Sequence, residues 1–126
     1  MPMTFVVDRV LRWMVSRADG VVTYADLDEH LNAEERERAL GLPELIDASG
    51  ASTDVTSKQV ERLVQRAAGM SRRMPLGPTA IVVQDPTAFG MARMYAILMD
   101  QVAPVGVFRD RASAISWLHG IEPPSG

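Results

Sequence analysis

The chain has 126 residues, of which 47% are hydrophobic and 23% are charged, and it contains no cysteine. This length suits one hydrophobic core, so we expect a single domain over residues 1–126. The absence of cysteine excludes disulfide scaffolds, thiolate zinc sites, iron–sulfur clusters and cysteine nucleophiles. A net charge of -3 gives no general attraction to nucleic acid. No apolar run reaches the length of a membrane span and no signal-peptide pattern begins the chain, so we expect a cytoplasmic protein.

The first segment, residues 4–17, is expected to be extended. Phe5, Val7 and Trp13 share one parity, whereas Ser16 falls on the opposite, polar parity. No glycine marks a turn inside the segment. The pattern therefore leaves open whether it forms one bent strand or two paired strands.

A helix is expected to begin at Thr23, which has an aspartate three residues later in a capping-box pattern. Leu27 and Leu31 form its inward stripe. Glu34 and Arg38 follow in a charged run at the i, i+4 spacing of favourable helical ion pairs. We interpret this run as a solvated helical face.

The next unit is a short strand over residues 45–47, then a loop over residues 48–54 and a helix that begins at Thr56. Thr56 with Gln59 matches the capping box, which makes this the clearest helix start in the chain. The inward stripe of this helix is Val60, Leu63, Val64 and Ala67.

The second half continues the alternation of strands and helices. Residues 80–83 are predicted to form a central strand, followed by a helix that opens at Pro86 and reaches about Val102. A last strand over residues 105–108 precedes a helix capped by Asp110, and residues 121–126 form a flexible tail. The order predicts an α/β fold with a mixed, mostly parallel sheet flanked by about four helices.

The chain offers little chemistry for catalysis. It has two histidines, His30 on the first helix and His119 at the end of the last helix, and we expect neither to be catalytic. Acidic residues near His30 are explained by a solvated helix face, so we predict no metal site and no cofactor. None of the nucleotide-binding or hydrolase motifs occurs. We therefore expect a protein that is not an enzyme.

Thr56 and Ser57 form a candidate phosphate or modification site. They lie where a strand end leads into a helix start, and the free N–H groups and dipole of a helix N-terminus stabilise a phosphate group. The simpler reading is that the hydroxyls only cap the helix.

The helix that opens at Pro86 has more apolar residues than one packing face can absorb. We expect a second contact on this helix, with a neighbouring helix of the same domain, with a partner or with an apolar ligand. The candidate residues are Phe89, Met91, Met94, Tyr95 and Leu98. A homodimer through Met91, Met94 and Leu98 is the simplest partner interaction, and a cavity beneath Phe89 and Tyr95 is the alternative.

Four segments carry a family resemblance: residues 20–23, 45–51, 85–95 and 107–118. The third contains Phe-Gly-x-Ala-Arg-x-Tyr and the fourth closes with Trp-Leu. In this order they resemble the STAS fold of bacterial anti-sigma-factor antagonists, particularly the SpoIIAA-like branch of small uncharacterised bacterial proteins. The resemblance covers nearly the whole chain and implies the α/β fold predicted above.

The resemblance also implies a function. In the antagonists a strand ends in Asp-x-Ser, which matches Asp47 and Ser49, and a phosphorylated serine follows at a helix start, which matches Ser57. It therefore implies a non-enzymatic protein-interaction module. The same branch is similar to lipid-binding Sec14-type domains, which implies a small hydrophobic ligand as the alternative.

Overall fold

The computed structural model describes residues 2–121, so the expected tail lies, apart from Ile121, outside the described residues. Five strands and four helices alternate along this part of the chain. They are β1 (Met3–Asp8), β2 (Trp13–Val22), α1 (Tyr24–Arg36), β3 (Glu44–Thr53), α2 (Ser57–Ser71), β4 (Thr79–Val83), α3 (Pro86–Leu98), β5 (Val105–Phe108) and α4 (Arg111–Gly120).

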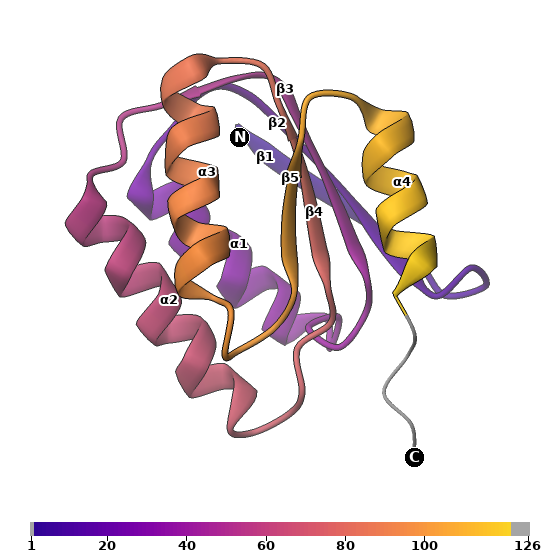
Figure 1. Cartoon of the computed structure of the whole chain (residues 1–126). Helices are drawn as coiled ribbons and strands as arrows, with labels where there is room; N and C mark the ends of the chain where they lie inside the picture. The colour runs from indigo at the N-terminus through magenta and orange to yellow at the C-terminus, as the bar shows by residue number, and fades with distance from the viewer. Residues whose placement is uncertain (1, 122–126) are drawn as a thin grey trace.

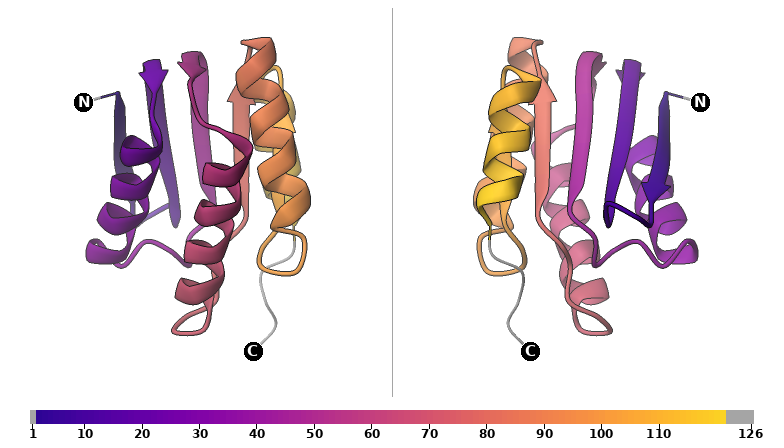
Figure 2. Two further views of the ribbon diagram at one scale, coloured as in Figure 1. Left: turned by 90° about the vertical axis from the view of Figure 1, so that its left-hand side faces the viewer. Right: turned by 90° about the vertical axis from the view of Figure 1, so that its right-hand side faces the viewer.

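The five strands form one sheet in the order β1-β2-β3-β4-β5. β1 is antiparallel to β2, and every later pair is parallel, because each later connection passes through a helix. Figure 1 shows α1, α2 and α3 over one face of the sheet and α4 over the other. The views in Figure 2 show the strands side by side between these two helical layers.

The helix starts confirm the capping patterns in the sequence. The hydroxyls of Thr23 and Thr56 each accept a hydrogen bond from the backbone N–H three residues later, and the side chain of that later residue accepts one from the backbone N–H of the cap. Asp85 and Asp110 cap α3 and α4 in the same way from their carboxylates. Local sequence therefore determines where each helix begins.

The first segment forms two paired strands, which resolves the alternative that the sequence left open. The Asp8 carboxylate accepts hydrogen bonds from the N–H groups of Val10 and Leu11, and Arg12 adopts a left-handed φ of 58°. This turn shifts the parity between the strands, so Phe5 pairs with Ser16 on one face. The prediction that Ser16 belongs to a polar face was wrong, because its side chain is fully buried beneath α1.

The predicted loop over residues 48–54 was also wrong for most of its length. β3 continues to Thr53 because Gly50 and Ala51 pair with Asp19 and Gly20 of β2. Gly20 has a φ of 71°, a conformation that glycine adopts without strain. The small, polar composition of this stretch masked a real strand.

Two hydrophobic cores lie on opposite faces of the sheet. The core under α4 is compact and contains Leu45, Ala80, Val82, Ala114 and Leu118. On the other face the apolar residues divide into one cluster near α1 and β2 and another between α2 and α3. The space between these two clusters is where the candidate site lies.

Candidate functional site

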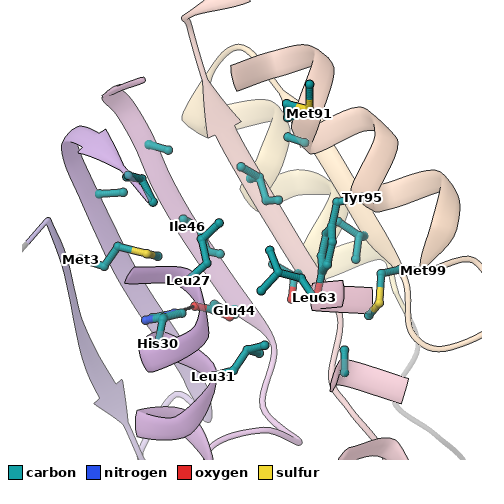
Figure 3. A pocket seen from close by; sticks show the side chains of 18 of the residues that line it. Met3, Leu27, His30, Leu31, Glu44, Ile46, Leu63, Met91, Tyr95 and Met99 are labelled. Carbon is teal, nitrogen blue, oxygen red and sulfur yellow. Dashed lines mark hydrogen bonds and ion pairs between the residues drawn. The ribbon is translucent and has the colours of Figure 1, made fainter. Parts of the chain in front are cut away.

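A cavity of about 180 Å³ lies between the sheet and helices α1, α2 and α3. Its lining is mostly apolar and comes from all three helices and from strands β1 to β5. Figure 3 shows Tyr95 of α3 and Met99, which directly follows α3, reaching into this space, with Leu63 of α2 and Ile46 of β3 nearby. The helices of this face therefore do not close completely on the sheet.

Three charged or titratable groups meet at the end of the cavity formed by α1. His30 Nε2 lies 2.8 Å from Glu34 Oε1 and 2.8 Å from Glu44 Oε2. The Ser16 hydroxyl donates a hydrogen bond of 2.6 Å to Glu44 Oε2 and lies 3.4 Å from the same imidazole nitrogen. We call His30, Glu34 and Glu44 the His–Glu cluster. All three residues are buried and line the cavity.

The cluster carries an unusual charge arrangement for a protein interior. One Nε2–H group faces two carboxylates, and a single N–H donates fully to only one of them. Burial disfavours the charged imidazolium, but the hydrogen bonds and charges of Glu34 and Glu44 outweigh it and raise the pKa of His30 to about 10. Burial and the neighbouring Glu44 charge raise the pKa of Glu34. The site therefore favours an additional proton or another cation.

The same geometry differs from a Ser–His–acid catalytic triad. In such a triad the serine and the carboxylate bind opposite nitrogens of the imidazole ring. Here Ser16 and both carboxylates approach the same atom, Nε2 of His30. The carboxylates thus occupy the position from which the imidazole would accept the serine proton.

The three cluster residues come from two elements. Leu27, His30, Leu31 and Glu34 follow the i, i+3, i+4, i+7 spacing, which places them on the face of α1 that packs on the sheet. The prediction that Glu34 lies on a solvated face was therefore wrong, as its residue is only 6% exposed. Glu44, the first residue of β3, contacts this face of α1 from the sheet.

Sequence reasoning missed this cluster. The signal for His30 and Glu34 was their spacing from Leu27, whereas the charge-run pattern pointed to solvent. The sequence analysis predicted no metal site. In the structure, His30, Glu34 and Glu44 offer potential metal-ligand atoms that all lie within 4.8 Å of one another.

The five candidate contact residues of α3 do not form one surface. Met91 and Tyr95 line the cavity, Phe89 lies under the Arg109 guanidinium at 4.1 Å, and Met94 is half-buried. Leu98 is 41% exposed. Two of the five residues therefore line the cavity and one lies on the outer surface.

The candidate phosphate site is placed as the sequence predicts. Thr56 is the N-cap of α2 and Ser57 its first residue, and both are exposed. The Thr56 hydroxyl is used as a cap, because it accepts a hydrogen bond from the Gln59 N–H. Modification of Ser57 stays a prediction.

Asp47 and Ser49 lie at a different place from the cavity. The Asp47 carboxylate accepts a 2.5 Å hydrogen bond from the Ser49 hydroxyl and pairs with Arg111 of α4 on the opposite face of the sheet. His119 is exposed at the end of α4. Among the described residues, none of the helices has the length and apolar character needed to cross a membrane.

No protein-family model matches the sequence, and no curated protein is significantly similar to it. The structure is similar to that of an uncharacterised protein of the DUF3478 family from Shewanella loihica PV-4, which is described as having a SpoIIAA-like fold. The TM-score is 0.61 at 17% sequence identity, and the match covers 92% of this chain and 93% of the other. The predicted architecture is confirmed at this level: the chain has a SpoIIAA-like fold, with a mostly parallel five-stranded sheet and four helices.

Proposed function

We propose that this protein binds a small apolar molecule in the cavity between the sheet and helices α1 to α3. The observation that carries the proposal is the cavity itself, because a folded interior is normally packed to the density of an organic crystal. Apolar pockets with a few convergent polar groups are the usual form of small-molecule sites. Here the polar groups are the His–Glu cluster at one end and Tyr95 toward α3.

The size of the cavity limits the ligand. An apolar cavity of about 150 Å³ accommodates a benzene molecule. The volume of about 180 Å³ therefore suits one aromatic ring or a short alkyl chain with a single polar group. A bulky phospholipid does not fit without movement of a helix.

The role we propose is binding without catalysis. Both carboxylates of the His–Glu cluster converge on the single atom His30 Nε2, which suits charge pairing better than proton transfer from a nucleophile. The proposal thus corresponds to the ligand-binding alternative in the sequence analysis.

Methionine methyl NMR tests the proposal directly. Met3, Met91 and Met99 line the cavity, whereas Met74 is an exposed methionine outside it. Titration of methyl-labelled protein with benzene, indole or 1-hexanol is expected to shift the first three signals in a saturable way. Unchanged signals with all three probes, or an equal response of Met74, would contradict the proposal.

A matched pair of variants locates the site. Ala92 lines the cavity, whereas Ala96, one turn later on α3, does not line it. Ala92→Leu fills part of the space and is expected to weaken binding of the same probe at least about tenfold. Ala96→Leu serves as the control and is expected to bind as the wild type does.

One observation supports the alternative hypothesis that the protein interacts with another protein. Ile97 and Leu98 are 67% and 41% exposed on the outer side of α3, although both are large and apolar. We propose, as a second candidate, that this side of α3 contacts a second copy of the chain. Sedimentation of wild type and Ile97→Glu at high concentration tests it: a dimer lost in the variant supports the contact, and a wild-type monomer refutes it.

A further inference from the structure

The His–Glu cluster has the geometry of a metal-binding site. His30 and Glu34 are four residues apart on one face of α1, the spacing that helical metal ligands commonly use. Glu44 approaches from β3, so its Oε2 and the Glu34 Oε1 each lie 2.8 Å from His30 Nε2. Three potential donor atoms from two elements thus lie within 4.8 Å of one another.

The charges of the cavity favour a divalent ion at this point. Two buried carboxylates face one imidazole, and the described residues that line the cavity include no lysine or arginine. Buried charge without a partner is strongly unfavourable. A divalent cation balances both carboxylates while the imidazole is neutral, the form in which histidine ligates metals.

We infer that His30, Glu34 and Glu44 form a binding site for a divalent transition-metal ion such as Zn²⁺. One imidazole and two carboxylates are donors that zinc accepts, whereas Mg²⁺ and Ca²⁺ prefer all-oxygen sites. In a tetrahedral zinc site neighbouring donors lie about 3.3 Å apart, because the bonds are about 2.0 Å long. The 2.8 Å separations reach this value when the two Glu side chains move by about half an ångström.

The surroundings of the cluster support its role as a ligand set. Ser16 donates a hydrogen bond to the Glu44 carboxylate and so fixes its orientation. The Phe5 ring packs edge-on against the His30 imidazole, with the ring centroids 5.5 Å apart. Because all three ligands line the cavity, a fourth metal position would face that space and could take a donor from a bound molecule.

The test uses the full chain after removal of metal with EDTA. Calorimetric titration with ZnCl₂ is expected to show one ion bound per chain, with no comparable heat from MgCl₂ or CaCl₂. Glu34→Gln and Glu44→Gln are each expected to weaken zinc binding at least about tenfold. The control is Glu35→Gln, because Glu35 is an exposed neighbour paired with Arg73 and is expected to leave zinc affinity unchanged.

A second readout on the wild type does not depend on whether the variants fold. The chain has only two histidines, and His119 is exposed far along the chain on α4. Histidine ¹⁵N NMR is expected to show a zinc-dependent shift of the His30 ring nitrogens and none for His119. Absence of zinc binding, binding at His119, or equal zinc affinity in folded Glu44→Gln protein would overturn the inference.

The inference stands apart from the proposed ligand binding. The probe is the metal ion alone, and the readout is the His30 imidazole, so a failure of the apolar probes to bind leaves the zinc result unaffected. Conversely, a cavity that binds indole while zinc fails refutes only the metal site.

Discussion

Removal of His30 is the perturbation that tests the energetics of the cluster most directly. In His30→Leu the carboxyl groups of Glu34 and Glu44 remain buried and lose their shared cationic partner. The attraction between opposite charges about 4 Å apart is about 4 kcal/mol at an effective dielectric constant of about 20. Uptake of a proton by one carboxyl limits the loss. Breaking a buried pair in this way typically lowers the free energy of unfolding by about 3–5 kcal/mol.

The comparison variant replaces the whole cluster with apolar residues. It combines His30→Leu, Glu34→Met and Glu44→Met with Ser16→Ala, because the Ser16 hydroxyl would otherwise lose its acceptor on Glu44. Buried ion pairs replaced by packed apolar side chains are often neutral or more stable. We therefore expect the free energy of unfolding of the quadruple variant to lie within about 1 kcal/mol of the wild-type value or above it.

The assay is thermal and urea unfolding at pH 7 in excess EDTA, followed by circular dichroism. His30→Leu is expected to lower Tm by about 10–20 °C, given about 4 °C per kcal/mol for a domain of this size. The reasoning fails if the quadruple variant is as unstable as His30→Leu. That result would mean that the intact cluster stabilises the fold more than apolar packing does. The cluster would then not be a destabilising feature that a bound cation offsets.

Three further predictions concern the scaffold. Leu45→Ala removes a fully buried side chain from the core under α4 and is expected to lower the free energy of unfolding by about 3–5 kcal/mol in urea titrations. Thr56→Ala removes the α2 cap and is expected to cost about 1 kcal/mol in the same titrations. The hydrogen bond from Ser49 and the Arg111 charge hold the pKa of Asp47 below its usual range, so its contribution is present above that range and lost as pH falls. Asp47→Asn is expected to lower stability by less than about 1 kcal/mol at pH 7 and to match the wild type near pH 2.

Local patterns predicted the helix starts well, because each helix begins with a side-chain cap that acts over three residues, but α3 ends at Leu98 and not near Val102 as expected. Thr23, Thr56, Asp85 and Asp110 all cap helices in the structure. The strands were harder, because strand pairing depends on residues far apart in the sequence. Gly50 is extended because it pairs with Asp19 of β2, and the residues next to Gly50 in the sequence do not indicate this pairing.

The candidate site was predictable only in part. Met91 and Tyr95 followed from the surplus of apolar residues on α3, and both line the cavity. The predicted exposure of Glu34 was wrong because its position in the sequence fits two patterns. One is an exposed ion pair with Arg38, and the other is an inward position seven residues after Leu27. Tertiary packing decides between these patterns. Arg38 lies beyond the end of α1 with a φ of 56°, so the helical pair cannot form.

The two sites proposed for this cavity set the charge that its ligand must carry. Without metal, the facing carboxylates of Glu34 and Glu44 favour a cationic or proton-donating group next to the apolar lining. With a divalent ion on the cluster this preference reverses, because the carboxylates are neutralised and the open metal position accepts an electron-pair donor. Without zinc, an alkyl amine should therefore bind more tightly than an alkyl carboxylate of equal size. When zinc is added, the carboxylate should bind more tightly than the amine. Such an exchange of order follows from a metal site that borders the ligand cavity and not from either site alone.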